Sequence, residues 1–223
     1  MKRIAIIGSG ISGLYASYLL YKDYSITIYE KEKYLGGHTR TLSVEYEKGI
    51  NLNIDTGFIV FNKQNYPNFT KMLNELNIDF GDSDMSFAVT SDKEEDLEIK
   101  YSNISSFFAD KKNIFSYKHY NLLYNINKFN YLSNKSLNNI NKNIRNITLG
   151  EFLKGNNFNN FFIENYIVPM GSSIWSCKSA QILQFPYLSY ARFMNNHGLL
   201  SINNQPQWHY IKNGSKTYVN SLV

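Results

Sequence analysis

The chain has 223 residues, 43% of them hydrophobic, and its 23 lysines and arginines against 18 acidic residues give a formal net charge of +5. That length suffices for one large domain or two small ones with a sizeable core. The basic residues form no cluster with interleaved aromatics, which predicts no nucleic-acid partner, and the single Cys177 excludes an internal disulfide framework and favours a reducing, cytoplasmic location.

The first thirty residues have the pattern of a βαβ unit. An apolar strand is predicted over residues 3–7, a helix over 12–22, and a second strand over 25–29 that ends on Glu30. The loop between the first strand and the helix reads Gly8-Ser9-Gly10-Ile11-Ser12-Gly13. Strand, glycine loop, helix, strand and acid in this order are typical of a dinucleotide-binding unit.

Each part of this layout has a physical role in such a unit. Gly8 permits the tight turn, Gly10 lets backbone N–H groups approach a pyrophosphate, and Gly13 lets helix and strand pack closely. The helix N-terminus favours phosphate, and the Glu30 carboxylate can accept hydrogen bonds from ribose hydroxyls while repelling a 2′-phosphate, which disfavours NADP. The alternative is a glycine turn that merely joins two core strands.

The basic start Lys2-Arg3, followed by apolar residues, imitates a signal peptide. Three glycines interrupt the apolar stretch and no small-residue cleavage site follows, so we expect no signal peptide. No segment reaches about 18 uninterrupted apolar residues, and no transmembrane segment is predicted.

The middle of the chain alternates between short strands and helical periodicity. Residues 31–40 form a glycine-containing loop, and we expect a hairpin from strands 41–46 and 50–54, a helix over 67–76, and strands over 80–90 and 97–101 joined by an acidic turn at 91–96. Helices are predicted over 104–109, 114–132 and 137–147.

Capping and turn residues mark the elements of the last third. Thr148 and Glu151 have capping-box spacing, a helix over 158–168 should end at Pro169, and another should run from Pro186 to residue 196. Finally we expect a strand over 208–212, a turn at Asn213-Gly214, and a helix capped by Ser215 with Tyr218, Val219 and Leu222 as its apolar stripe.

No group of side chains has the spacing of a metal site or of a Ser-His-Asp triad. His119, His197 and His209 are expected to be structural or surface residues, and Cys177 to be a small buried apolar residue. Met170 and Trp175 are expected in the core, with a substrate tunnel as the alternative. The sequence therefore identifies no catalytic residue.

From Leu35-Gly36-Gly37-His38 onward, the chain resembles the flavin-dependent amine oxidase superfamily, which includes phytoene desaturases and protoporphyrinogen oxidases. Within it, the chain is similar to bacterial predicted NAD/FAD-binding proteins associated with cyclopropane fatty acid synthase. The matching stretches are Gly36-Gly37-His38-Thr39, residues 55–62, 83–87, 169–176, 196–200 and 206–208.

The resemblance implies FAD rather than NAD. It places Gly36, Gly37, His38 and Thr39 at the pyrophosphate. His38 stands where arginine is usual, so His38 either contacts the cofactor or only caps the loop. The resemblance places Gly57, Phe58 and Ile59 along the flavin ring. The full set of expected cofactor-binding residues is Gly8, Ser9, Gly10, Ile11, Ser12, Gly13, Glu30, Lys31, Gly36, Gly37, His38, Thr39, Gly57, Phe58 and Ile59.

The expected fold class is α/β, a Rossmann-like FAD-binding βαβ domain with a mixed β and largely helical substrate-cap insertion. The FAD-binding part is expected at 1–65, the cap at 66–204, and a return segment at 205–223. The resemblance further implies that the chain ends before the C-terminal FAD-binding segment, so that a missing half or a separate chain would be a partner.

Two classes of function follow. The first is an FAD-dependent oxidoreductase of the amine-oxidase type that transfers hydride from an organic small molecule, an apolar one such as a lipid or isoprenoid, to flavin N5. The second is a truncated or non-catalytic FAD- or nucleotide-binding module. An NAD-dependent dehydrogenase is a third option, which the Gly36-Gly37 pair disfavours.

Overall fold

A computed structural model describes residues 1–91, 97–101, 104–108, 110–140, 142–201 and 206–223. The chain forms two compact units, one of residues 1–84 with 207–223 and one of residues 85–206. We expected the first boundary at residue 66. The structure instead groups residues 66–84 with the N-terminal unit, because the helix Pro67–Glu75 packs in the core of that unit and the strand Phe80–Ser83 pairs with the strand Trp208–Ile211.

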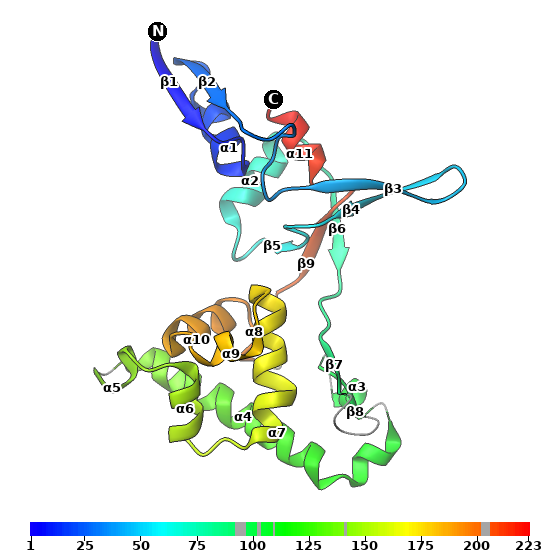
Figure 1. The fold of residues 1–223 in the computed structure, drawn as a ribbon, viewed down its shortest axis with the longest axis vertical. Helices are drawn as coiled ribbons and strands as arrows, with labels where there is room; N and C mark the ends of the chain where they lie inside the picture. Colours follow the sequence, from blue (N-terminus) through cyan, green and yellow to red (C-terminus); the bar gives the residue numbers. More distant parts are fainter. Residues whose placement is uncertain (92–96, 102–103, 109, 141, 202–205) are drawn as a thin grey trace. The chain divides into compact units, whose positions relative to one another are not determined.

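The first unit begins with the expected βαβ arrangement (Figure 1). Strands β1 (Lys2–Ile7) and β2 (Tyr24–Tyr29) pair in parallel, with Ile4 opposite Ile26, and α1 (Ile11–Leu20) connects them. Alternate residues of both strands are more buried than their neighbours, because one face of the pair packs on α1. The Rossmann-like fold class is confirmed.

A hairpin and a small sheet complete this unit. Strands β3 (Thr41–Glu47) and β4 (Ile50–Asp55) are antiparallel, with Gly49 at φ +87° in the turn. Helix α2 (Pro67–Glu75) and the three-stranded antiparallel sheet in the order β5 (Phe61–Asn62), β9 (Trp208–Ile211), β6 (Phe80–Ser83) follow. The expected hairpin and the helix beginning at Pro67 are confirmed.

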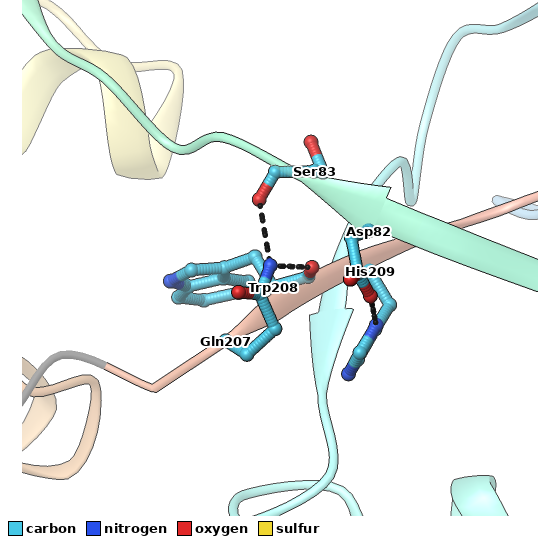
Figure 2. A network of polar contacts seen from close by, with 5 residues as sticks. All are labelled: Asp82, Ser83, Gln207, Trp208 and His209. Atoms are coloured by element: carbon cyan, nitrogen blue, oxygen red, sulfur yellow. Dashed lines mark hydrogen bonds and ion pairs between the residues drawn. The ribbon is translucent and has the colours of Figure 1, made fainter.

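Side-chain contacts tie β6 to β9 at one end of the three-stranded sheet (Figure 2). His209 Nδ1 lies 3.0 Å from Asp82 Oδ1, and the Gln207 amide donates to the Ser83 carbonyl at 3.3 Å. The His209 ring is buried and lies 5.2 Å from the Phe80 ring. His209 is therefore a structural residue, as expected.

The core of the first unit joins segments that lie far apart in the chain. It contains Leu14 of α1, Phe61 of β5, Leu73 of α2 and, from α11 (Lys216–Ser221), Tyr218 and Val219. The expected apolar stripe of the last helix is confirmed. The expected cap is wrong, because Ser215 occupies the N-cap position but its hydroxyl donates to Asp55 and to the Phe58 carbonyl instead.

The second unit is mainly helical. It contains the antiparallel pair β7 (Ala88–Ser91) and β8 (Leu97–Lys100), α3 (Ile104–Phe107), the 3-10 turn η1 (Lys111–Phe115), α4 (Tyr117–Asn138), α5 (Lys142–Arg145), α6 (Leu149–Gly155), α7 (Asn160–Phe162), the π-helical turn η2 (Ile163–Ile167), α8 (Val168–Trp175), α9 (Ser179–Leu183) and α10 (Tyr187–Asn196). Its core is aromatic, and the Phe152 and Tyr187 rings stack 3.7 Å apart. Met170 and Trp175 belong to this core, as expected.

Two expected elements differ from the structure, and a third cannot be compared with it. The single strand over 80–90 is two strands, because β6 pairs with β9 whereas β7 pairs with β8. The break between helices at 132–137 does not occur, because Ser133 is buried inside a continuous α4 and lies 3.4 Å from the Tyr187 hydroxyl. The acidic turn at 91–96 lies mostly outside the described residues.

Pro169 does not end a helix, contrary to expectation. The chain passes from η2 into α8 through a π-helical turn, in which the Val168 N–H donates to the Ile163 carbonyl. In an α-helix the carbonyl of Asn165 would face the N–H that proline lacks. The Tyr101 hydroxyl donates to that carbonyl at 2.8 Å, so a side chain satisfies the acceptor and the helical path continues.

Candidate functional site

The glycine turn after β1 has the geometry that a tight strand-to-helix turn requires. Gly8 has φ +93°, and its N–H donates to the Tyr29 carbonyl at 2.8 Å. A Cβ at Gly13 would lie 2.3 Å from the Gly8 oxygen and 3.1 Å from Ile6 Cγ2. The sequence-based roles of Gly8 in the turn and Gly13 in helix–strand packing are confirmed.

Gly10 differs from these two glycines because the space beside it is open. Its φ of −61° is accessible to any residue, and a Cβ built on it would meet nothing within 4 Å. It is the N-cap of α1 and brings no side chain to cap the helix. The first helical hydrogen bond runs from Leu14 N–H to the Gly10 carbonyl, so the amides of Ile11, Ser12 and Gly13 precede it and suit an anion.

Glu30 lies against this turn. Its Oε2 accepts hydrogen bonds from the backbone N–H of Ser9, at 2.8 Å, and from the Ser9 hydroxyl, while its Oε1 accepts from the Glu32 N–H at 2.8 Å. The Glu32 N–H and then the Ser9 donors lower the pKa of Glu30 to about 2. The carboxylate is thus ionised at neutral pH and held beside the glycine turn, while Lys31 next to it is exposed.

The second glycine pair adjoins the first turn directly. The Gly36 N–H donates to the Ser9 carbonyl at 2.9 Å, and Gly10 and Gly36 form a parallel bridge. Gly36 and Gly37 have φ values of +102° and +59°, and a Cβ on Gly37 would lie 3.1 Å from the Gly10 Cα. Two glycine loops separated by some 25 residues therefore lie backbone to backbone.

The N–H and the hydroxyl of Thr39 both have hydrogen-bond partners within the chain. Its N–H donates to the Gly36 carbonyl at 3.0 Å, and its buried hydroxyl lies 3.2 Å from the Tyr218 hydroxyl. His38 is exposed beside it. Thr39 thus connects the glycine pair to α11.

The three expected flavin-ring residues have different surroundings. A Cβ on Gly57 would lie 2.0 Å from the His38 carbonyl oxygen, so this glycine accommodates the chain's own backbone. Phe58 packs edge-on against the Tyr66 and Phe69 rings at 5.7 and 5.4 Å, within the core. Ile59 is 54% exposed, and of the three it alone presents most of its side chain to solvent.

Two clefts flank the glycine loops. The larger, of about 530 Å³, is lined by Ser9, Leu14, Ser17, Tyr18, Tyr21, Ile26, Ile28, Glu30, Leu35, Ser221, Leu222 and Val223. It is mostly apolar, with the Glu30 carboxylate as its one charged side chain. The second, of about 390 Å³, includes the cations of Arg40 and Lys216.

Sequence reasoning missed the contact that ties the hairpin to the return segment. The Ser215 N–H donates to both Asp55 carboxylate oxygens at 2.9 and 3.0 Å, and the hydroxyls of Ser215 and Thr41 donate to the same carboxylate. A Cβ on Gly214 would lie 2.4 Å from Thr41 Cγ2. Only the nearness of Asp55 to Gly57 and of Ser215 to an Asn-Gly turn hinted at it, and neither pattern names a partner 160 residues away.

Comparison with known proteins agrees with this geometry. A family model described as an NAD(P)-binding Rossmann-like domain matches residues 6–76. No curated protein sequence matches the chain. The fold of the chain is therefore that of a Rossmann-like dinucleotide-binding protein with a mixed helix and strand insertion.

The solved structures that resemble the chain include two amine oxidases and a further oxidoreductase. Wild-type putrescine oxidase bound to putrescine has a TM-score of 0.65 at 15% identity, and cyclohexylamine oxidase from Brevibacterium oxydans has 0.66 at 15%; each comparison covers 99% of this chain and 48% of the other. An oxidoreductase from Methanosarcina mazei has a TM-score of 0.58 at 18% identity, over 100% of this chain and 48% of the other. The chain spans about half the length of these proteins, and at such identities the likeness shows the fold.

Among the residues that the structure describes, no group of three or more His, Cys, Asp or Glu side chains is arranged to hold a metal ion. Within the same described ranges, none of the helices combines the length and the hydropathy needed to cross a bilayer.

Proposed function

We propose that the N-terminal unit binds FAD. The observation that carries this proposal is the juxtaposition of three features: the open side of Gly10, the abutting Gly36-Gly37 pair, and the Glu30 carboxylate hydrogen-bonded to the same turn. The amides of residues 11–13 at the helix N-terminus suit a diphosphate, the glycine pair lets the chain approach it closely, and a fixed carboxylate suits the two hydroxyls of a ribose.

Different residues would bind different parts of the cofactor. Gly10 with the amides of residues 11–13 and the pair Gly36-Gly37 would hold the pyrophosphate, and Glu30 the adenosine ribose. The larger cleft, which is mostly apolar and has Glu30 as its one charged side chain, would take the adenine. His38 and Lys31 are exposed close to these groups and would add charge at the rim, whereas Thr39 would act by fixing the glycine pair through Tyr218.

We further propose that the chain belongs to an oxidoreductase of the amine-oxidase type, with an apolar organic molecule, such as a lipid or isoprenoid, as the substrate. The flavin amine oxidase folds among its neighbours support the reaction class. FAD when bound supplies a hydride acceptor at N5. The chain would supply the orientation of the dinucleotide through the two glycine loops, and Ile59 offers an exposed apolar side chain next to the Gly57 turn.

Two other functions compete. The family model that matches is described as NAD(P)-binding, which favours a nicotinamide dinucleotide in the same turn. The second is a module that binds FAD without turnover, since the glycine turn and Glu30 account for binding of a dinucleotide and not for a reaction. The Glu30 carboxylate would repel the 2′-phosphate of NADP in either case.

The test is to release the cofactor from the purified chain, or from the chain incubated with FAD, NAD and NADP together, and to identify it by anion-exchange chromatography. The proposal predicts FAD, and retention of NAD or of no nucleotide would contradict it. Anaerobic addition of a lipid, an isoprenoid or a long-chain amine to the yellow protein, with putrescine as the polar comparison, then separates the functions. Bleaching of the flavin bands supports the oxidoreductase, and colour that no substrate bleaches supports the module.

A further inference from the structure

Helix α4 presents a row of exposed tyrosines. Tyr117, Tyr120, Tyr124 and Tyr131 are 80%, 51%, 64% and 65% exposed. Their spacing of three, four and seven residues places them on one face of the helix, opposite the face that buries residues such as Leu122 and Phe129 in the core. Four large aromatic side chains on one solvent-facing row exceed what scattered surface apolar residues explain.

The turn that precedes this helix extends the same surface. In η1, Phe115 is 91% exposed and Ile114 is 42% exposed, and Lys111 and Lys112 come immediately before them and are exposed as well. An apolar pair that protrudes beside two cations is costly in water, because its apolar area stays hydrated. Ile114 and Phe115, with the two lysines beside them, therefore suit a partner that has an anionic surface and an apolar interior.

The helix and the turn before it carry an excess of cations, and the acid beside them is Asp110, whose carboxylate accepts a hydrogen bond from the Lys112 N–H at 2.9 Å. Residues 111–150 contain seven lysines and arginines and no aspartate or glutamate. Lys128 donates to the Asn156 carbonyl at 2.6 Å and so serves the unit itself. Lys111, Lys112 and Lys135 are exposed, and Lys135 lies four residues after Tyr131 on the same face.

We propose that this α4 face, made of Phe115, Tyr117, Tyr120, Tyr124, Tyr131 and Lys135, docks on an anionic lipid bilayer. Tyrosine suits the headgroup level because its ring is apolar and its hydroxyl is polar. At about 1.5 Å per residue the helix is roughly 33 Å long, which allows it to lie along a surface. Ile114 and Phe115 would enter the acyl boundary while the lysines meet anionic headgroups.

Single-stranded nucleic acid also binds basic surfaces with aromatics. The aliphatic side chain of Ile114 beside Phe115 has no stacking role, and insertion into lipid uses both side chains. The bilayer is therefore the occupant that fits the apolar turn and the cations together. This inference does not depend on the FAD proposal, since no residue of the α4 face belongs to the first unit.

The experiment is co-sedimentation of the full chain with vesicles of phosphatidylcholine alone or of phosphatidylcholine and phosphatidylserine. We expect binding to the mixed vesicles that weakens with added salt, and little binding to phosphatidylcholine. Each exposed lysine near an anionic surface contributes about a fivefold factor, so Lys111→Gln with Lys112→Gln should weaken partitioning by about 25-fold. The matched control, Lys33→Gln with Lys48→Gln, removes the same charge from the first unit and should leave binding nearly unchanged.

The apolar part of the proposal has its own test. Phe115→Ala should weaken binding by about tenfold, whereas Tyr46→Ala, at another exposed aromatic on the β3–β4 hairpin, should not. In Phe115→Trp, the added fluorescence should be quenched by vesicles carrying brominated acyl chains, which reports insertion in a folded protein. Equal loss from the charge variant and its control, absence of quenching, preference for single-stranded RNA, or a dimer that buries the face in sedimentation would each overturn the proposal.

Discussion

Gly13→Ala should destabilise the first unit, because α1 packs on β1 with no room for a methyl group. The added Cβ would lie 2.3 Å from the Gly8 carbonyl oxygen. The backbone of Gly8 cannot move away freely, because the Gly8 N–H donates a hydrogen bond to the Tyr29 carbonyl. Replacing glycine by alanine in a helix gains about 1 kcal/mol of propensity. Overpacking costs about 1–3 kcal/mol, and a backbone contact this short places it at the upper end, so the net loss should be about 1–2 kcal/mol.

The matched control is Gly10→Ala, three residues earlier in the same turn. Its φ of −61° suits alanine and its Cβ would meet nothing within 4 Å, so the stability of the unit should change by less than about 1 kcal/mol, because the lower entropy of the unfolded chain offsets the weaker preference of alanine for the N-cap. Urea unfolding in a Trp175→Phe background would be followed by the fluorescence of Trp208, which lies in the first unit. A Gly13→Ala midpoint equal to or above that of Gly10→Ala would refute the packing argument.

Three further predictions concern single contacts. Glu30 should stabilise the fold fully above its unfolded pKa of about 4.5 and progressively less as the pH falls toward 2, so the stability gap between wild type and Glu30→Gln, followed by Trp208, should close over that range. Burial lowers the pKa of His119, whose ring nitrogens have no hydrogen-bond partner among the described residues. As the pH falls below 6.5, the unfolded state therefore binds a proton that the folded state does not bind. The free energy of unfolding, followed by Trp175 fluorescence, should decrease below this pH, and it should decrease less in His119→Leu. Tyr101→Phe should cost about 1–3 kcal/mol in urea unfolding, and less in a Pro169→Ala background that restores a backbone donor, whereas equal costs would show that the hydroxyl does not compensate for the proline.

Local signals correctly predicted most elements of the first unit and the start of one helix of the second. The βαβ unit, the hairpin, the helix that begins at Pro67 and the capping box at Thr148 each depend on residues within one or two turns of each other. The juxtaposition of the Gly8 to Gly13 turn with Glu30 also followed from the pattern, because the carboxyl ends of adjacent parallel strands meet at one edge.

The predictions that failed concern residues whose contact partners lie far away in the sequence. The helix through Pro169 continues because a tyrosine 64 residues away supplies a hydrogen bond, and α4 continues past Ser133 because the hydroxyl of Tyr187 lies beside it. Asp55 and Ser215, like the two strands that replaced the single strand over 80–90, take their partners from the fold. No local propensity contains that information.

The row of tyrosines on α4 was hidden for a related reason. Its cations and aromatics are spread over some forty residues, so they form no cluster in the sequence and gather on one face only when a single 22-residue helix forms.

The central claim is that the open side of Gly10 receives the diphosphate of FAD, and an equilibrium titration of FAD into three proteins tests it most directly. Gly10→Glu places a carboxylate in that open space, and Gly155→Glu makes the same change at an exposed glycine of α6 where a Cβ also meets nothing within 4 Å. We predict that Gly10→Glu weakens FAD binding by at least a hundredfold without lowering the unfolding midpoint of Trp208, and that Gly155→Glu binds like wild type. FAD affinity that Gly10→Glu leaves unchanged would contradict the account.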